Sequence, residues 1–408
     1  MKAIPGVDPS PAAVVRPASI PELDGARAVA ALGVFVFHAA TAATPLNKHV
    51  FRLTAILNSG VGVFFVLSGF LIYRPFCEAN IAGLPVPDLA RYLVRRVLRI
   101  YPAYLVCLVI WWRFGIVEIL GVRGFLKHAS LLDMYWAPAQ RGGAGLEVAW
   151  TLQIEMTFYV LAPLFAILVR LAGAGLRRAT DGRVQQAALE LAATLTLAVA
   201  GVLAIPWHSP EAHTLVRLML PWMGELGTGM ALAVLVTAST RHDWAHAARA
   251  TLSRIPMFVW LTGAAAMIVW LGLTTVNGWF CVFCMSPQQH VLQDRLTVPL
   301  AVLFVTPLVI GGRPGLARRT LASRPFVWLG VVSYSFYLWH QPIIKGVPKR
   351  WYALHGPWVS FATISLELGL SLIAAAISFR FVERPGILLG RRFRGLRRSG
   401  RVTPVSSP

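Results

Sequence analysis

Long apolar segments alternate with short polar or basic loops along most of this chain. A run of about 20 apolar residues is long enough to cross the hydrocarbon core of a bilayer as a helix. We place ten such segments, each to within several residues, at 26–44, 57–77, 100–120, 148–170, 186–206, 215–237, 255–275, 295–311, 325–344 and 358–381. The pattern predicts an all-α, polytopic membrane helix bundle of about ten transmembrane helices.

Composition and charge support this class and orient the bundle. The chain has 408 residues, 56% of them hydrophobic, which excludes an ordinary soluble domain. Its net charge of +21 suggests a nucleic-acid partner at first sight, but the basic residues lie in short loops between apolar segments. If the N-terminus is cytoplasmic, 27 of the 38 Lys and Arg residues face the cytoplasm. We therefore predict a multi-pass protein of the cell inner (plasma) membrane, N-in and C-in, with no nucleic-acid partner.

The two ends of the chain differ from its centre. Residues 1–22 are polar and rich in proline and predict a disordered cytoplasmic leader rather than a signal peptide. Residues 23–385 predict one membrane domain, and residues 386–408 predict a basic cytoplasmic tail. Since no long soluble segment separates the spans, any chemistry is expected within the membrane bundle.

The first apolar segment carries two ionisable residues, Arg27 and His38. At about 100° per residue, eleven steps return nearly to the same helix face, and at about 1.5 Å per residue they separate the two Cα atoms by roughly 16 Å. An arginine at the membrane surface would then hold the histidine about halfway across the bilayer, where ionisable residues are usually functional. The alternative is a histidine that only hydrogen-bonds a neighbouring helix.

A basic amphipathic segment, 88–101, follows the second span. Its four arginines, among them Arg96 and Arg99, alternate with apolar residues and predict a helix lying on the cytoplasmic face of the membrane. Such a helix commonly contacts anionic lipid. The same arginines also suit a phosphate-binding site, because the planar guanidinium group binds phosphate through two hydrogen bonds.

The cysteines do not indicate a metal site. Cys77 and Cys107 lie at or in spans and are expected to be inert small hydrophobes. Cys281 and Cys284 form a Cys-x-x-Cys pair in a predicted outside loop, where a disulfide or two free thiols are expected. A metal would need further ligands, and only His290 is close, so we predict none.

Six short motifs follow one another along the chain: the Arg-to-His segment 23–38, the Gly-rich segment 60–72, the Arg-x-x-Arg element 96–102, the Trp-led segment 150–155, the Ser-Tyr-led segment 333–342 and the Phe-Val-Glu-Arg-Pro segment 381–385. In this order they resemble one family, the acyltransferase-3 family of membrane O-acyltransferases. In one departure, Glu155 is followed by Met156 where many relatives have a second glutamate.

This resemblance implies transfer of an acyl group, most often acetyl, from acyl-CoA to a hydroxyl of an envelope carbohydrate, a glycolipid or a secreted small molecule. Acyl-CoA would be a co-substrate, with no permanently bound cofactor. His38 would act as general base or, in a variant, as a transient acyl carrier. Arg27, Arg96 and Arg99 would bind the phosphates of acyl-CoA. The predicted partners are thus acyl-CoA, the carbohydrate or glycolipid acceptor and the lipid bilayer.

Four further residues are candidates for the site. Glu155 is expected to orient His38 or hold the hydroxyls of the acceptor; the alternative is an ion pair with Arg113 or another buried arginine. Trp150 would stack on a sugar, or anchor its span at the interface. Tyr337 and His340 would line an acceptor site, or form part of an interfacial belt.

A different class, a proton-coupled secondary transporter or a flippase of a related envelope precursor, also uses intramembrane His, Glu and Arg residues. Glu225 and Glu367 are further carboxylates within spans, either structural or with a direct role in the site. Transporters commonly contain internal repeats, and nothing after residue 200 repeats the Arg-to-His segment. Stoichiometric release of CoA would distinguish the enzyme from the transporter.

Overall fold

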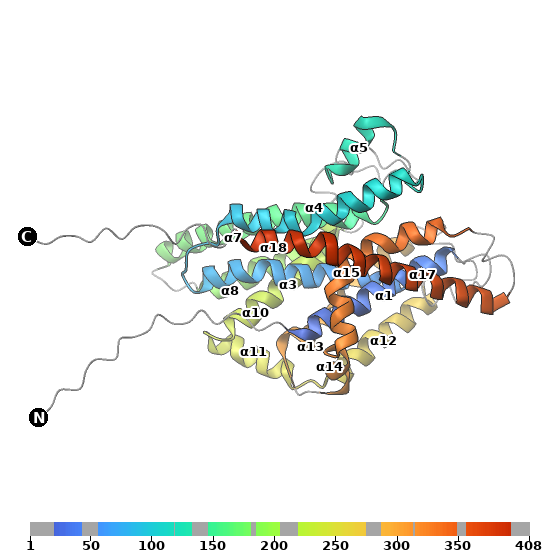
Figure 1. Ribbon diagram of the computed structural model, residues 1–408. Coiled ribbons are helices and arrows are strands. Elements are labelled where there is room, and N and C mark those ends of the chain that lie inside the picture. The colour runs from blue at the N-terminus through green and yellow to red at the C-terminus, as the bar shows by residue number, and fades with distance from the viewer. Residues whose placement is uncertain are drawn as a thin grey trace, which may run out of the picture.

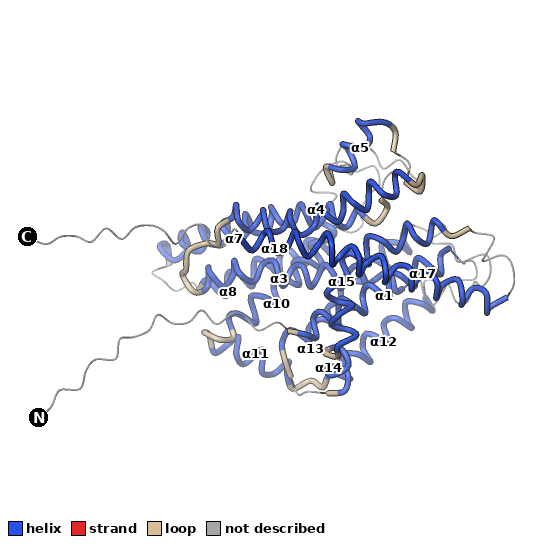
Figure 2. The backbone as a smooth tube through the Cα atoms, viewed as in Figure 1, coloured by secondary structure: helices blue, strands red, loops and turns tan. Residues whose placement is uncertain are grey.

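The computed structural model describes residues 20–42, 56–117, 119–132, 146–180, 185–204, 219–274, 287–312, 315–348 and 356–392. These residues form helices joined by short connections, and Figure 2 shows no strand among them. The leader 1–19, the Cys281 and Cys284 pair and the last residues, 393–408, lie outside the described part of the chain.

Each of the ten predicted segments contains a helix. These helices are α1 (Pro21–Ala42), α3 (Gly60–Ile81), α4 (Leu89–Arg113), α7 (Ala149–Ala179), α8 (Gln186–Ala204), α10 (Met223–Ala238), α12 (Met257–Thr274), α13 (Pro287–Ile310), α15 (Arg324–Gly346) and α17 (Gly356–Ser378). The shorter elements are η1 (Ile56–Ser59), α5 (Gly121–Ala129), η3 (Leu220–Trp222), α11 (Asp243–Ser253), α14 (Leu316–Leu321), the π-helical turn η5 (Phe379–Glu383) and α18 (Arg384–Arg392).

Six helical stretches in the described part of the chain are long and apolar enough to cross a membrane. They are Pro21–Ala42, Leu57–Ile81, Ala149–Ala179, Gln186–Ala204, Leu220–Ala238 and Phe361–Arg392. The all-α, polytopic membrane class is therefore confirmed, whereas the number of ten spans is not. Helix α4 illustrates the difference, because arginines occupy much of its first half.

The long helices pack in two groups. At the left of Figure 1, α3 packs against α10, and α10 against α8. At the right, α1 packs against α15, and α15 against α17. Contacts between α1 and α3 join the groups, while α5 stands away from the bundle at the upper right.

Helices α1 and α15 approach each other backbone to backbone near the start of α1. A Cβ atom on Gly330 of α15 would overlap the carbonyl oxygen of Asp24. On the other side of this crossing, a Cβ atom on Gly25 of α1 would overlap the carbonyl oxygen of Leu321, the last residue of α14. Small residues allow such close approach of helices within membranes. These contacts fix the position of Arg27, half a turn further along α1.

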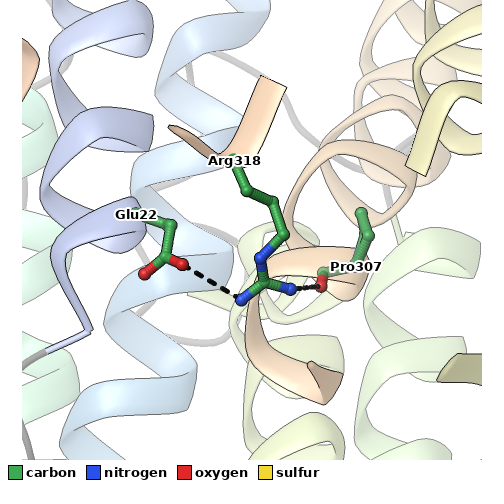
Figure 3. Close-up of polar contacts among 3 residues, drawn as sticks. All are labelled: Glu22, Pro307 and Arg318. Carbon is green, nitrogen blue, oxygen red and sulfur yellow. Dashed lines mark hydrogen bonds and ion pairs between the residues drawn. The ribbon is translucent and has the colours of Figure 1, made fainter. Parts of the chain in front are cut away.

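Arg318 of α14 holds the start of α1 against the end of α13 (Figure 3). Its guanidinium group lies 3.2 Å from the Glu22 carboxylate and donates a 3.1 Å hydrogen bond to the carbonyl oxygen of Pro307. That carbonyl lies in the last turn of α13, where helix carbonyls have no partner within the helix. One side chain therefore satisfies an orphan acceptor and neutralises a carboxylate.

The arginine-rich segment 88–101 differs from its prediction. It does not form a separate surface helix but the first half of α4, which continues through Pro102 to Arg113. A proline inside a helix deprives the carbonyl four residues earlier of its hydrogen bond, here the carbonyl of Leu98. Gly386 of α18 packs against this carbonyl, where any Cβ atom would overlap its oxygen. The contact with α18 thus accommodates the proline within a continuous helix.

The predicted tail begins inside α18. Residues 386–392 are helical and pack on α4, because the π-helical turn η5 carries the chain from α17 into α18 without a break. Elsewhere in the bundle, Cys77 and Cys107 are fully buried and free, as expected for small hydrophobic residues.

We expect Gly330→Ala to destabilise the bundle, because its methyl group would overlap the backbone of α1 and overpacking of this kind costs about 1–3 kcal/mol. Gly175→Ala is the matched control, since a Cβ atom there meets nothing within 4 Å. The measurement is the temperature at which purified protein in detergent loses its monodisperse elution peak. Equal temperatures for the two variants would contradict the close approach of α1 and α15.

Candidate active site

One pocket lies among α1, α3, α4, α7 and α15. It contains a cavity of about 90 Å³ that water-sized molecules can enter. Its apolar wall includes Val61, Phe64, Phe65, Leu71, Ile72, Ile100 and Leu152. Its polar lining consists of Arg27, Ser68, Arg96, Arg99, Thr151, Glu155, Tyr159, Ser333, Tyr334 and Tyr337.

The three arginines named from the sequence share this pocket. Arg27 reaches it from α1 and lies 3.6 Å from Asp24, one turn earlier in the helix. Arg96 of α4 lies over the rings of Tyr92 and Tyr159, 5.5 and 5.2 Å from their centroids, a cation–π arrangement. Since Arg96 and Arg99 line the pocket, these two arginines are directed into the bundle and not only towards lipid.

Glu155 faces the arginines from α7. Its Oε1 atom accepts hydrogen bonds from the Tyr159 hydroxyl at 2.7 Å and from the Ser68 hydroxyl at 3.3 Å. The predicted alternative partner Arg113 is the exposed last residue of α4 and does not line the pocket. The carboxylate is therefore held by hydroxyl groups within a cationic pocket, and its hydrogen bonds do not involve His38.

Sequence reasoning missed several hydroxyl groups that line the pocket. Tyr334, which was missed, donates a 2.7 Å hydrogen bond to the carbonyl oxygen of Ile100. The hydroxyl of Thr151, also missed, lies 3.2 Å from that of Tyr337, which the sequence did suggest for the site. Tyr159 follows Glu155 by four residues, a spacing that places both side chains on one helix face. That spacing was the available signal for Tyr159, whereas nothing in the sequence indicated that Tyr334 would contact α4.

His38 pairs with His340. The Nδ1 atom of His38 lies 2.9 Å from Nε2 of His340, whose Nδ1 lies 2.8 Å from the carbonyl oxygen of Tyr337. A carbonyl can only accept, so Nδ1 of His340 carries the proton and its Nε2 is the acceptor in neutral imidazole. Nδ1 of His38 then donates to His340. This tautomer leaves the Nε2 atom of His38 with its lone pair.

Tyr337 lies between the pocket and the histidine pair. Its side chain lines the pocket, and its ring centroid lies 5.6 Å from that of His340 and 6.0 Å from that of Phe64. His38 is not among the lining residues. Arg27 and His38 were expected on one face of one helix; in the structure Arg27 lines the pocket, whereas His38 lies outside its lining and pairs with His340.

Trp150 lies in a cluster of aromatic rings. Its centroid is 5.0 Å from that of Trp222 and 6.3 Å from that of Phe65. These contacts are with protein rings, and Trp150 does not line the pocket. Stacking on a sugar therefore stays a prediction for this residue.

Further carboxylates are buried in the bundle. Glu383, in the π-helical turn, accepts a 2.9 Å hydrogen bond from Ser335, and Glu190 accepts hydrogen bonds from Tyr73 and Asn80. Glu225 and Glu367 are also buried, at 3% and 0% exposure, and lie outside the lining of the pocket. Within the described ranges, no group of three or more His, Cys, Asp and Glu residues is suited to hold a metal ion.

The fold and this site define a polytopic membrane protein that encloses a cationic, hydroxyl-lined pocket beside a histidine pair. The chain belongs to the acyltransferase-3 family, whose profile, described as an acyltransferase domain, matches residues 20–380. The family predicted from the six motifs is thereby confirmed, and the matched region contains every residue that lines the pocket and both histidines of the pair.

Curated relatives share moderate identity with this chain. It is 27% identical to YrhL of Bacillus subtilis (strain 168), provisionally named a peptidoglycan O-acetyltransferase, over 90% of this chain and 54% of the relative. It is 25% identical to the O-acetyltransferase OatA of Staphylococcus aureus (strain NCTC 8325), over 90% and 57%. Identity to the peptidoglycan O-acetyltransferase OatA of Listeria monocytogenes (strain EGD-e) is 26%, over 90% and 55%.

The chain spans little more than half the length of these relatives. A comparison with solved structures gave no significant match. Family membership therefore rests on the sequence profile and on these curated relatives.

We expect the histidine pair to be visible in the ¹⁵N NMR spectrum of histidine-labelled protein. His38 should be a neutral Nδ1–H tautomer, because His340 presents an acceptor to that nitrogen. His340→Leu removes the acceptor and should shift His38 towards the Nε2–H tautomer that free imidazole favours. The His38→Asn spectrum assigns the resonance, and an Nε2–H tautomer in the unaltered protein would contradict the proposed hydrogen-bond direction.

Proposed function

We propose that this protein transfers an acyl group, most simply acetyl, from cytoplasmic acyl-CoA to a hydroxyl group of a cell-envelope carbohydrate or glycolipid. The observation that carries the proposal is the adjacency of a pocket lined by three arginines and a histidine pair with an available lone pair, separated by Tyr337. The protein would act in the plasma membrane, with donor and acceptor entering from opposite faces.

Arg27, Arg96 and Arg99 would bind the phosphates of the donor. Three guanidinium groups around one pocket provide many donors in a planar geometry that matches phosphate. The pantetheine arm carries amide and hydroxyl groups, for which Tyr334 and Ser333 offer partners. The acyl end would then point past Tyr337 towards His38.

His38 would act as general base. Its Nε2 atom takes the proton of the acceptor hydroxyl while the hydroxyl oxygen attacks the thioester carbonyl carbon. The C–S bond then breaks, and the His38 imidazolium returns this proton to the sulfur, which leaves as the thiol of CoA. General base catalysis of this kind contributes about 10²- to 10⁴-fold. His340 would position His38 and stabilise the imidazolium through their shared hydrogen bond. An acyl-histidine intermediate remains a variant, which ping-pong kinetics would distinguish.

Glu155 would serve the donor pocket and not His38 directly. Its carboxylate lies in the same pocket as the three arginines, which supports a role in compensating their charge before the donor enters. The hydroxyl groups of Ser68 and Tyr159 keep this carboxylate in place. We propose that it orients the arginines or binds donor hydroxyls, in place of the predicted contact with His38.

The acceptor class rests on the relatives. Two of the three are named for O-acetylation of peptidoglycan, a carbohydrate polymer of the cell envelope. Membership of an acyltransferase family also argues against the transporter or flippase alternative. A sugar hydroxyl is a weak acid, so its attack on a thioester would need the base that His38 supplies.

His38→Ala should lower transfer of radiolabel from acetyl-CoA into glycan or lipid by about 10²- to 10⁴-fold, because the variant lacks the proposed base. The assay uses membrane vesicles with equal amounts of protein, and the labelled product is extracted and identified. His246→Ala, which replaces an exposed histidine of α11, is the control. Equal labelling by the His38 variant would remove this residue from the mechanism, and labelling without free CoA production would argue against acyl transfer from CoA.

Replacing a pocket arginine should weaken the use of an acyl donor that carries phosphates and leave the use of a donor without phosphates unchanged. Arg99→Gln should raise the KM for acetyl-CoA about tenfold or more, since a hydrogen bond between charged groups typically contributes about 1.5–3 kcal/mol. The same variant should use S-acetyl-N-acetylcysteamine, a thioester without phosphates, as well as the unaltered protein does. Arg91→Gln on the same helix, where Arg91 pairs with Asp88 at 3.2 Å, is the control. Equal losses with both donors would exclude phosphate binding by Arg99.

A further inference from the structure

Three polar side chains form a second cluster beside the histidine pair. Gln341 of α15 donates a hydrogen bond from its amide nitrogen to the Glu147 carboxylate, just before the start of α7. The other oxygen of Glu147 lies 3.0 Å from the ammonium group of Lys345, one turn after Gln341. We call Glu147, Gln341 and Lys345 the outer cluster, because the charge pattern predicts this end of α7 and α15 to face away from the cytoplasm.

The outer cluster is connected to the histidine pair through α15. Gln341 directly follows His340, the hydrogen-bonding partner of His38. None of the three residues lines the pocket that contains the arginines.

Neither the fold nor the mechanism above accounts for these residues. Glu147 and Lys345 are 45% and 39% exposed, and an ion pair at that exposure contributes only about 0–1 kcal/mol to stability. Gln341 is 7% exposed, so its amide is a fixed donor aimed at the carboxylate. The cluster therefore exposes the Glu147 carboxylate, which Gln341 holds in place, and the Lys345 ammonium group to solvent.

We propose that the outer cluster is the subsite that binds the hydroxyl and amide groups of a carbohydrate acceptor next to the Nε2 atom of His38. A carboxylate accepts hydrogen bonds from two neighbouring sugar hydroxyls, and an ammonium group donates to ring, hydroxyl or acetamido oxygens. Together they match the mixed donors and acceptors of a sugar. The inference rests on the proposed function and adds to it the residues that choose and orient the acceptor.

The test is binding of N,N′,N″,N‴-tetraacetylchitotetraose, an oligomer of N-acetylglucosamine, to the full chain in lipid nanodiscs by calorimetry. Glu147→Ala and Lys345→Met should each weaken binding about tenfold or more, because a lost hydrogen bond to a charged group typically costs that much. Lys127→Met, which removes an exposed lysine of α5 on the same predicted side, should bind as tightly as the unaltered protein. Absence of binding by the unaltered protein, or unchanged affinity in the two cluster variants, would overturn the proposal.

A charge exchange separates binding from a structural role. The double variant Glu147→Lys with Lys345→Glu retains an ion pair but exchanges the positions of donor and acceptor. If the cluster only joins α7 to α15, the exchange restores oligosaccharide affinity to within about twofold, and the proposal fails. If it binds the sugar, the loss persists while the affinity for acetyl-CoA, measured on the same samples, is unchanged.

The subsite and the proposed function can be disproved separately. Release of CoA from acetyl-CoA in vesicles with their native acceptor tests acyl transfer without reference to Glu147. A protein that releases CoA but binds no oligosaccharide retains its proposed function and loses this subsite. A protein that binds the oligosaccharide through Glu147 but never releases CoA retains the subsite as a carbohydrate site and loses the proposed reaction.

Discussion

The contact between α1 and α15 is the constraint on which the rest of the structure depends. The two helices run in the same direction and touch at three levels: at Asp24 and Gly330, at the rings of Phe35 and Phe336 with centroids 5.8 Å apart, and at His38 and His340. Arg27 follows the first level and the histidine pair forms the last. One helix pair therefore sets both the depth of the arginine pocket and the orientation of the base.

Several polar groups inside this apolar bundle have specific partners on other helices. Unpaired polar groups are costly within a membrane, so these contacts reduce the cost of placing them there. Hydroxyl groups hold the carboxylates of Glu155 and Glu383, while Arg318 serves both a carboxylate and an orphan carbonyl. These hydrogen bonds and ion pairs join helices that are far apart in the chain. The contacts that stabilise the buried polar side chains, such as that of Glu155, therefore also shape the pocket.

The sequence predicted the apolar segments well because hydrophobic length is a local property. It also predicted Arg27, Arg96 and Arg99 as one phosphate-binding set, and these three side chains do share a pocket. Glu155, which the sequence assigned to His38 or to the acceptor, lines the same pocket. It could not predict that His340 would pair with His38, because the two are 302 residues apart and no local pattern encodes that contact. Nor could it show that α4 is continuous through a proline, since the helix that accommodates that proline comes from the end of the chain.

The interlocked backbones of α1 and α15 also bear on how reactants reach the site. A carrier exposes its binding site to each side in turn by moving one group of helices against another. Sliding of α1 along α15 would bring Leu329 or Val331 against the backbone that Gly330 now contacts, where a Cβ atom has no room. The pair thus opposes the helix movement that alternating exposure requires. The proposed transfer reaction moves only a small chemical group and needs no such sliding.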